Sequence, residues 1–420
     1  MSSKLEIEYN DVKRYNTSAK PLKQARWTLW IIWTVSYLFL KYYKVKIDKS
    51  LDKQVKPPYL LLCNHTQFLD FMVSAMANYP YRINNIVSID GFNISPWLLR
   101  KIGSIPKRKF INDSALIKNI NYVLNDLKDI VGLYPEARYS FCGTTSVLPD
   151  SLGKLVKLCK APVVVLIFKG NHLQKPSWAD KKRNVKPEAV KKLILSSADI
   201  ENLDSEEIND IIKKALEYND YNYQKENNIL IKEKYRAEGL HKILYKCANC
   251  GKEFKMHSEG IELHCDECSS SWILKENGEL ECQNADTKFN TIPEWYEWER
   301  KEVRKEIEAD NYELSFTSRA VSMPHPKRFV ELGTASFFQN INGISIKGNY
   351  NGKDFSLEKH PLESYSIHVE YNFPYLRNRD IVGISTNDDT LFFIPEDSRK
   401  IQKISIATEE LYKYYKEGAK

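Results

Sequence analysis

The sequence lacks the patterns that are typical of repeat proteins, disordered proteins and secreted proteins. No internal repeat indicates a solenoid, and no long polar or repetitive tract indicates disorder. Its most apolar segment begins late and is not closely followed by a small-residue cleavage site, which argues against a secretory signal. The 420 residues, of which 42% are hydrophobic, instead predict a globular protein of about two to four domains.

Basic charge is scarce outside the N-terminal part of the chain. Residues 1–60 contain twelve Lys and Arg against five Asp and Glu, an excess that equals the net charge of +7 of the whole chain. The remainder is therefore close to neutral. It lacks the interleaved basic and aromatic residues that are typical of a nucleic-acid surface, so we expect no nucleic-acid partner.

An uncharged apolar segment, WTLWIIWTVSYLFL, lies inside this basic region at 27–40. A helix of this length rises only about 21 Å, which is short of the roughly 30 Å hydrocarbon layer of a bilayer. We therefore expect residues 1–50 to associate with a membrane through a helix at 27–43 that is monotopic or re-entrant, and a full span would need the neighbouring residues as well. Its basic flanks suit anionic head groups on the cytoplasmic face. A buried core helix is the alternative.

Apolar runs and helical patterns alternate over 51–235, which predicts an α/β domain with a mostly parallel sheet flanked by helices. The polar residues that follow each run indicate turns between strands and helices. The expected strands are 58–63, 85–89, 130–134, 162–168 and 193–200, and the clearest expected helices are 113–127 and 204–218.

The pattern changes again in the last third of the chain. Residues 284–310 include a charge-rich stretch that begins with proline, at 293–308, and this predicts a connecting helix. Residues 311–420 contain short apolar runs separated by turn signals, and end in a helical stretch at 398–416. They predict a β-rich domain closed by a helix, an order of elements that resembles a pleckstrin-homology domain.

The eight cysteines are interpreted as thiols or metal ligands, because nothing else indicates an oxidising compartment. Two C-x-x-C pairs, with fourteen residues between them, predict a closed structural zinc site in a ribbon at 240–283. A redox dithiol is the alternative. The remaining four cysteines are expected to be small buried apolar residues. The predicted zinc ligands are Cys247, Cys250, Cys265 and Cys268.

His65 and Asp70 form an H-x-x-x-x-D pair at the expected turn from the strand at 58–63 into a helix. In open parallel sheets, ligands bind outside the carboxyl ends of the strands, so both side chains can face one crevice. A carboxylate that orients one imidazole nitrogen leaves the other free to accept a proton. The pair is a candidate for base catalysis, and a structural histidine held by a helix cap is the alternative.

Four blocks of this region resemble, in order, those of the glycerolipid acyltransferase family that includes the lysophosphatidic acid acyltransferases. The resemblance implies an acyltransferase-like fold and an O-acyltransferase of phospholipid biosynthesis. Its donor would be an acyl thioester, on coenzyme A or acyl carrier protein, and its acceptor a lysophospholipid, foremost 1-acyl-glycerol-3-phosphate. It implies no redox cofactor. The blocks are NHTQFLD at 64–70, IGSIPKRK at 102–109, LYPEARYS at 133–140 and APVVVLIFKG at 161–170.

The resemblance also implies roles for single residues. His65 and Asp70 would be the catalytic pair. Two departures, Ala137 in place of the family's glycine and Arg138 one position early, leave the acceptor open between lysophosphatidate, glycerol 3-phosphate and another lysolipid. The residues implied to bind substrate are Gly103, Lys107, Arg108, Glu136 and Arg138, with Lys109 in reserve.

Two alternatives to these roles remain. Without the family resemblance, Arg108 would be read as a solvated surface charge. A non-catalytic, membrane-tethered adaptor that binds partners through its ribbon and β domain is the alternative from another functional class.

Overall fold

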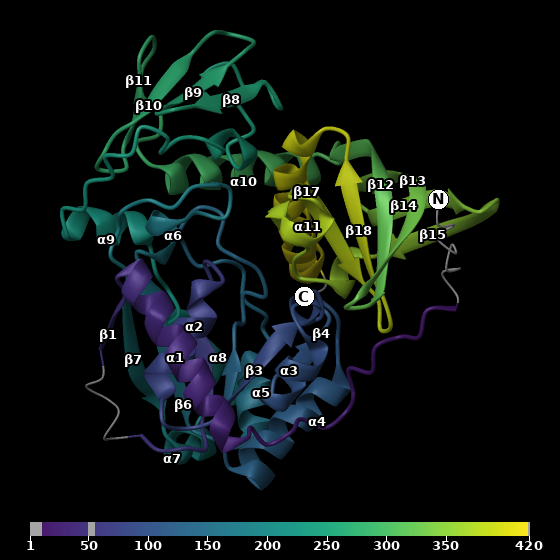
Figure 1. The fold of residues 1–420 in the computed structure, drawn as a ribbon. Helices are drawn as coiled ribbons and strands as arrows, with labels where there is room; N and C mark the ends of the chain where they lie inside the picture. Colours follow the sequence, from purple (N-terminus) through teal and green to yellow (C-terminus); the bar gives the residue numbers. More distant parts are fainter. Residues whose placement is uncertain (1–10, 49–54, 419–420) are drawn as a thin grey trace, which may run out of the picture.

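The computed structural model describes residues 11–48 and 55–418, so parts of the predicted N-terminal segment 1–50 lie outside the described residues. Figure 1 shows an α/β lobe, a small antiparallel module at the top of the view, and a β-rich lobe with a long helix. The predicted α/β class with a mostly parallel sheet is confirmed, and two antiparallel sheets are separate from it.

The sheet of the α/β lobe has seven strands in the order β1-β7-β6-β2-β5-β3-β4. All neighbours are parallel except β6 and β7, which are antiparallel. The central strands are continuous apolar runs because helices cover both faces of the sheet. The strands are β1 (Lys46–Asp48), β2 (Leu60–Cys63), β3 (Ile83–Ser88), β4 (Ile105–Lys107), β5 (Ile130–Leu133), β6 (Val163–Lys169) and β7 (Glu188–Leu195).

Successive side chains of β2 point to opposite faces of this sheet, as the pleat requires. Leu60 and Leu62 belong to one apolar cluster, with α4 (Ser114–Tyr122), α5 (Leu152–Cys159) and α8 (Ser205–Ala215). Leu61 and Cys63 belong to another, with α1 (Arg26–Tyr43) and α2 (Leu69–Asn78). The turn from β2 into α2 therefore lies at the carboxyl edge of a three-layered lobe.

Helix α1 covers this lobe but is exposed along most of its length. Its buried residues are Thr28, Ser36 and Leu40. Because the helix keeps one narrow face inward, the alternative of a buried core helix is wrong. No helix in the described part of the chain is both long enough and apolar enough to cross a membrane.

One sequence prediction for this lobe is wrong in detail. The last strand, β7, runs over Glu188–Leu195 and not 193–200, because a capping box at Ser196 starts helix α7 (Ser197–Asn202) there. The helix expected at 113–127 is present as α4, which is followed directly by a π-helical turn at Val123–Leu127. Three further short helices are α3 (Pro96–Lys101), α6 (Asn171–Gln174) and α9 (Asp220–Glu226).

The small module is an antiparallel sheet in the order β11-β10-β9-β8. Trp272 packs edge-on against Trp295 of helix α10 (Ile292–Glu308), with ring centroids 4.8 Å apart, so the module rests on the connecting helix predicted at 293–308. Its strands are β8 (Met256–Glu259), β9 (Glu262–Cys265), β10 (Ser271–Leu274) and β11 (Leu280–Cys282).

The β-rich lobe is a seven-stranded antiparallel sheet in the order β15-β14-β13-β12-β18-β17-β16, followed by helix α11 (Ile401–Gly418). This is the strand-rich segment with a terminal helix that the sequence indicates, and its likeness to a pleckstrin-homology domain stays a prediction. The strands are β12 (Glu313–His325), β13 (Arg328–Asn340), β14 (Gly343–Tyr350), β15 (Lys353–Lys359), β16 (His368–Phe373), β17 (Arg379–Ser385) and β18 (Thr390–Pro395).

Candidate active site

The turn between β2 and α2 is held rigidly at both ends. Asn64 anchors its start, because its side-chain amide donates to the carbonyl of Phe168 (2.9 Å) and its carbonyl accepts the Phe168 N–H (2.8 Å). Phe168 lies on the neighbouring strand β6, so the loop leaves the sheet at a fixed point. The carbonyl of His65 also accepts the N–H of Ser140 at 2.8 Å.

His65 and Asp70 meet as the sequence predicts, with His65 Nδ1 lying 3.0 Å from Asp70 Oδ2. Asp70 is fully buried in the first turn of α2 and accepts the backbone N–H groups of Thr66 (2.6 Å) and Gln67 (3.0 Å). Its other oxygen accepts the side-chain amide of Asn171 at 2.6 Å. These donors fix the direction of the carboxylate, so Asp70 can hold the imidazole in one orientation. Asn171 has no signal in the sequence.

The second ring nitrogen of His65 points away from this carboxylate. The His65 side chain is 22% exposed, and no described residue forms a hydrogen bond with its Nε2. Two tyrosine rings flank the imidazole, with centroids 4.4 Å away for Tyr134 and 4.6 Å for Tyr139. The geometry provides an oriented imidazole base with no serine or cysteine hydroxyl or thiol bonded to it.

Glu136 supports the backbone of this site. One of its carboxylate oxygens accepts the His65 N–H at 3.0 Å, and the other accepts the Ser146 N–H at 2.9 Å. Burial raises the pKa of Glu136 to about 7, although these N–H groups and the charge of Arg138 oppose the rise. Both oxygens already have partners in the protein, so the geometry assigns Glu136 to positioning His65.

The residue after Glu136 has an uncommon backbone conformation. Ala137 has φ +54°, in the left-handed region that favours glycine. The chain therefore makes a left-handed turn here although the residue is not glycine. It directs the next side chain, Arg138, out of the α/β lobe.

Arg138 is buried and does not join His65. Its guanidinium donates to Glu409 of α11 at 2.6 Å and lies over the ring of Phe141. Glu409 also accepts from Arg300 of α10 at 2.9 Å and from the Ser366 hydroxyl at 2.8 Å. The β-rich lobe thus holds the loop that contains Glu136 through a buried charge network.

Replacing Glu409 by Gln is expected to lower the free energy of unfolding by about 3–5 kcal/mol, because two buried guanidinium groups lose charge compensation. Burial opposes the ionisation of Glu409, but Arg138 and Arg300 hold its pKa at about 2, below the ordinary 4.5. Its stabilising contribution is therefore complete above pH 4.5 and is lost as the pH falls toward 2. Urea unfolding at neutral and acidic pH measures both effects.

Glu417→Gln is the matched control for this experiment, because Glu417 lies on the same helix and pairs with Arg304 at the surface. An exposed pair of this kind contributes about 1 kcal/mol or less. Equal destabilisation by the two substitutions would contradict a stabilising role for the buried charge network between the lobes.

Other predicted substrate-binding residues also have structural partners. Arg108 is 1% exposed, and its guanidinium donates to Thr390 (2.9 Å) and to the Asp388 carbonyl (2.8 Å) in the β-rich lobe. Lys107 donates to the carbonyl of Ile111, and burial lowers its pKa although the charge of Asp113 opposes this. Arg108 is buried, so the alternative that it is a solvated surface charge is wrong.

Gly103 shapes the backbone ahead of β4. Its φ is +84°, and a Cβ there would lie 2.5 Å from the amide nitrogen of Asn84. The Asn84 amide donates to the Gly103 carbonyl at 2.7 Å. The glycine is therefore required for a tight turn, and the hydrogen bond from Asn84 stabilises this turn.

Lys109, the last residue of this block, contacts a group of titratable side chains. Its ammonium lies 2.7 Å from Nε2 of His368 and 3.8 Å from a carboxylate oxygen of Asp90. Asp90, His368 and Glu370 form a group close enough to bind a metal, and the Lys109 ammonium supplies positive charge to it. Burial raises the pKa of Tyr139 well above its ordinary value, and the charges of Glu370, Asp70 and Asp90 raise it further.

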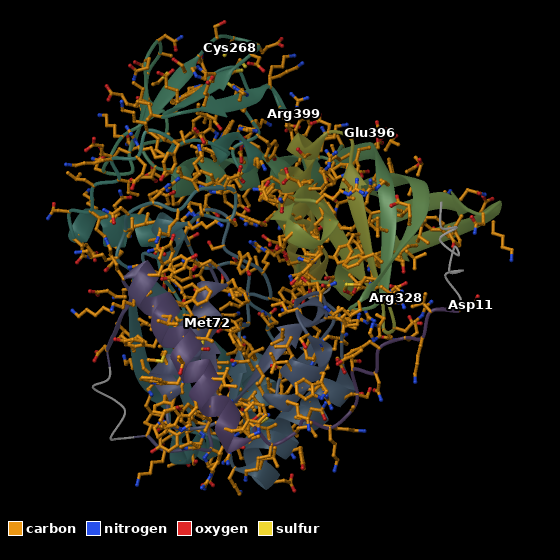
Figure 2. All side chains as sticks on the ribbon, viewed as in Figure 1. Asp11, Met72, Cys268, Arg328, Glu396 and Arg399 are labelled. Carbon is orange, nitrogen blue, oxygen red and sulfur yellow. The ribbon has the colours of Figure 1, made fainter. Side chains whose placement is uncertain are left out.

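The four predicted zinc ligands converge in the small module. The sulfur of Cys247 is 3.7 Å from that of Cys268, and the sulfur of Cys250 is 3.8 Å from that of Cys265. A tetrahedral ion with Zn–S bonds of about 2.3 Å separates its sulfurs by about 3.8 Å, so the cluster fits zinc. Figure 2 labels Cys268 in this module and Met72 on α2 in a different lobe, so the cluster is not part of the His65 site. The other cysteines, Cys63, Cys142, Cys159 and Cys282, are buried as expected.

No protein-family model matches the chain, and no curated protein matches it in sequence. One solved structure that is similar to it is the 1-acyl-sn-glycerophosphate (LPA) acyltransferase PlsC from Thermotoga maritima. The similarity has a TM-score of 0.39 and 14% identity, and covers 46% of this chain and 81% of that chain. It is too weak to show a family, so the function proposed below depends on the geometry around His65.

Proposed function

We propose that the protein is an O-acyltransferase that moves a fatty acyl group from a thioester to the hydroxyl of a lysophospholipid in phospholipid biosynthesis. The observation that supports this most strongly is the His65–Asp70 pair, whose imidazole has one nitrogen oriented and the other free of protein partners. A thioester carbonyl is already reactive, whereas an alcohol is a poor nucleophile near neutral pH. Removing the proton from the alcohol is therefore the main task of the enzyme.

The proposed reaction has no acyl-enzyme intermediate. His65 Nε2 takes the proton of the acceptor hydroxyl while the hydroxyl oxygen attacks the thioester carbonyl carbon. The carbon–sulfur bond then breaks, and the leaving thiolate receives the proton from the imidazolium. Asp70 stabilises the imidazolium while it exists, and Glu136 keeps the His65 backbone in place.

The acceptor is proposed to be 1-acyl-glycerol-3-phosphate, with Lys109 proposed as the cation that binds its phosphate. A specific observation favours a second candidate, a lysolipid with another head group. Arg108 and Arg138 are engaged by the β-rich lobe, and the carboxylates of Asp90 and Glu370 lie beside Lys109. Such a mixed group suits hydroxyl or amine substituents as well as a phosphate.

A panel of acceptors tests this proposal directly. Purified protein is mixed with palmitoyl-CoA or palmitoyl acyl carrier protein and with lysophosphatidate, glycerol 3-phosphate or lysophosphatidylcholine, and the lipids are analysed by mass spectrometry. Formation of a diacyl lipid from one lysolipid supports the proposal. Absence of any new ester with all acceptors and both donors would favour the non-catalytic adaptor.

We also propose that the outer face of α1 binds a bilayer at its cytoplasmic surface. In a soluble amphipathic helix the exposed face is polar, but the exposed face of α1 carries large apolar residues. They include Trp30 (70% exposed), Leu38 (59%) and Tyr42 (68%). Phe68, which caps the start of α2, and Trp97 on α3 are also exposed. Exposed apolar side chains of this kind, with Arg26 and Lys41 at the ends of α1, suit an interface rich in anionic lipid.

Trp30→Glu is expected to weaken binding to vesicles of phosphatidylcholine and phosphatidylglycerol by about tenfold or more, because a charge replaces an interfacial ring. Co-sedimentation measures the bound fraction. Leu158→Glu is the control, since Leu158 is similarly exposed (57%) but lies on α5, on the opposite face of the sheet. Unchanged sedimentation of Trp30→Glu, or an equal loss in the control, would contradict the proposed docking face.

The four-cysteine module is proposed to bind a structural zinc ion through Cys247, Cys250, Cys265 and Cys268. All four positions of a tetrahedral ion would be filled by thiolates, so the ion would stabilise the ribbon and take no part in acyl transfer.

A further inference from the structure

A group of possible metal ligands lies where the α/β lobe contacts the β-rich lobe. Asp90 comes shortly after β3, at the carboxyl edge of the parallel sheet, whereas His368 and Glu370 belong to β16. One ligand atom from each of these three residues lies within 4.8 Å of the other two. Asp90 and His368 are buried, and the side chain of Glu370 is 20% exposed. The group is therefore sheltered from water on most sides and can be reached from solvent at Glu370.

The spacing of the two residues on β16 suits a shared ion. His368 and Glu370 are two residues apart in a regular part of the strand, so their side chains point to the same face of the sheet. Nε2 of His368 lies 3.1 Å from a carboxylate oxygen of Glu370. Two ligands bonded to one ion at about 2.1 Å lie roughly 3.0–3.4 Å apart. The pair therefore has the separation of neighbouring metal ligands.

Hydrogen bonds within the group cannot satisfy this histidine. Its Nε2 lies 2.7 Å from the ammonium of Lys109 and 3.1 Å from the carboxylate of Glu370. With a proton on Nε2, the nitrogen can donate to the carboxylate but meets a second donor in the ammonium. With a lone pair on Nε2, the nitrogen can accept from the ammonium but faces the lone pairs of the carboxylate. A divalent cation attracts the lone pairs of the nitrogen and of the carboxylates together.

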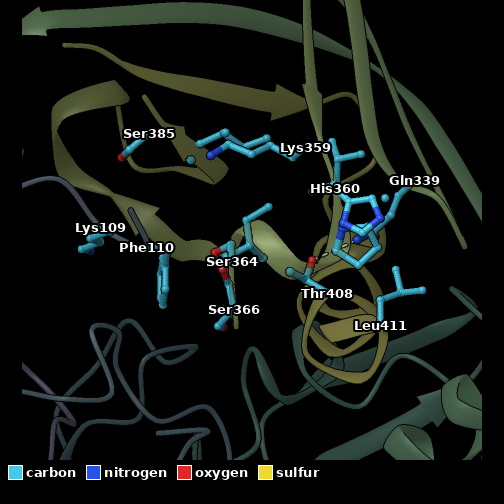
Figure 3. A pocket seen from close by; sticks show the side chains of 16 residues that line it. Lys109, Phe110, Gln339, Lys359, His360, Ser364, Ser366, Ser385, Thr408 and Leu411 are labelled. Atoms are coloured by element: carbon cyan, nitrogen blue, oxygen red, sulfur yellow. Dashed lines mark hydrogen bonds between the residues drawn. The ribbon is translucent and has the colours of Figure 1, made fainter. Parts of the chain in front are cut away.

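Lys109 supplies the positive charge of the group from a flexible side chain. Its ammonium is 3.8 Å from a carboxylate oxygen of Asp90, and its side chain is 17% exposed, so it has a route to solvent. The loop that carries Lys109 is held by the next residue, because Phe110 packs edge-on against Tyr365 with ring centroids 5.3 Å apart. Figure 3 shows Phe110 with Lys109 on one side of it and Ser364 on the other. The ammonium can therefore leave the group while the lobes stay in contact.

We infer that Asp90, His368 and Glu370 bind a divalent metal ion, of the class of Mn²⁺ and Zn²⁺, in exchange for the ammonium of Lys109. Two carboxylates and one imidazole are a ligand set for such ions. The ion would join the two lobes, because Asp90 belongs to one lobe and the other two ligands belong to the other. The inference does not depend on the proposed acyl transfer. It is also separate from the four-cysteine site, whose thiolates suit Zn²⁺ and not Mn²⁺.

Mn²⁺ titration of the full-length protein tests the site, with the paramagnetic resonance signal of free Mn²⁺ as the measure of binding. We expect saturable binding at a single site. Glu370→Gln removes an anionic ligand and is expected to weaken binding about tenfold or more, whereas Lys109→Met removes the competing ammonium and should tighten it about tenfold. Glu363→Gln is the control and should bind as the parent does, because Glu363 is 53% exposed in the same lobe and lies outside the group.

Thermal unfolding provides a second measurement and identifies the folded variants. Excess Mn²⁺ should raise the Tm of the parent protein, because it binds the folded state, and should raise that of Asp90→Asn less. Metal analysis shows whether an ion is already present, and a second metal equivalent that Glu370→Gln loses would support the site as well.

Three results overturn the inference. The first is the absence of both a second metal equivalent and saturable Mn²⁺ binding from the parent and from Lys109→Met. The second is equal binding by the parent and by folded Glu370→Gln, or an equal loss in Glu363→Gln. The third, which decides the matter if Glu370→Gln does not fold, is binding by Lys109→Met that is no tighter than that of the parent.

Discussion

His65→Ala is expected to lower acyl transfer at least about a thousandfold while leaving the fold intact. The substitution removes the proposed general base, and losses of this size are typical when a catalytic imidazole is removed. The His65 ring forms one hydrogen bond, to Asp70, and is partly exposed, so its loss should cost little stability. Labelled acyl transfer to lysophospholipid by detergent-solubilised protein measures the rate, and circular dichroism measures the fold.

Two companion variants show whether the loss is specific. Asp70→Asn should also lower transfer strongly, because its amide cannot hold the imidazole in the same tautomer or stabilise the imidazolium. His257→Ala, which removes an exposed histidine of the ribbon, should transfer at the wild-type rate. Turnover by His65→Ala near the wild-type rate would remove the mechanism, and equal losses in all three variants would indicate a general effect on the protein.

Removing the metal from the ribbon is expected to unfold it. Purified protein should contain about one equivalent of zinc, and Cys247→Ser should lose it, because three thiolates and a hydroxyl form a poorer closed site. Structural zinc contributes about 10–16 kcal/mol to small zinc modules, so the ribbon should become sensitive to proteolysis within 240–283. Metal analysis and limited proteolysis with and without a chelator measure these effects.

Cys282→Ser is the matched control, since Cys282 is a buried cysteine of the same module that lies outside the four-sulfur cluster. It should keep its zinc and its resistance to protease. Less than about half an equivalent of zinc in the wild type, or a Cys247→Ser protein as resistant as the control, would exclude the closed site.

The features that could be predicted from sequence are formed by residues that lie close together along the chain. His65 and Asp70 are five residues apart across the start of a helix, so the strand-to-helix turn alone brings them together. Each C-x-x-C pair likewise forms within one turn, and Cys250 donates its N–H to the sulfur of Cys247. The apolar runs of the central strands β2 and β6 could be recognised because these strands are buried on both faces.

The partners of the basic residues could not be predicted, because they come from the other end of the chain. Arg108 is satisfied by Asp388 and Thr390, and Arg138 by Glu409, across more than half of the sequence. A motif shows which side chain is present, but it does not indicate which distant residues form hydrogen bonds with it. The left-handed backbone of Ala137, which turns the chain ahead of Arg138, also has no signal in the residue itself.

The edge strands of the sheet were also not predicted, because they depend on pairing with strands that are distant in the sequence. Strands β1 and β4 have three residues each and carry too short a pattern to be recognised. They exist because β7 and β3 offer them hydrogen bonds. The antiparallel direction of β7 is also decided by its pairing with β6 and not by its own residues.

The central claim is that His65 activates an acceptor hydroxyl directly, with no acylated protein on the way. The most direct test mixes the protein with palmitoyl-CoA, before and after adding a mixture of lysophospholipids, and follows intact protein mass, thiol release and lipid products together. We expect thiol release and diacyl lipid only after the acceptor is added, with the protein mass unchanged throughout. An acylated protein formed without acceptor, or product formation by His65→Ala at the wild-type rate, would contradict the account.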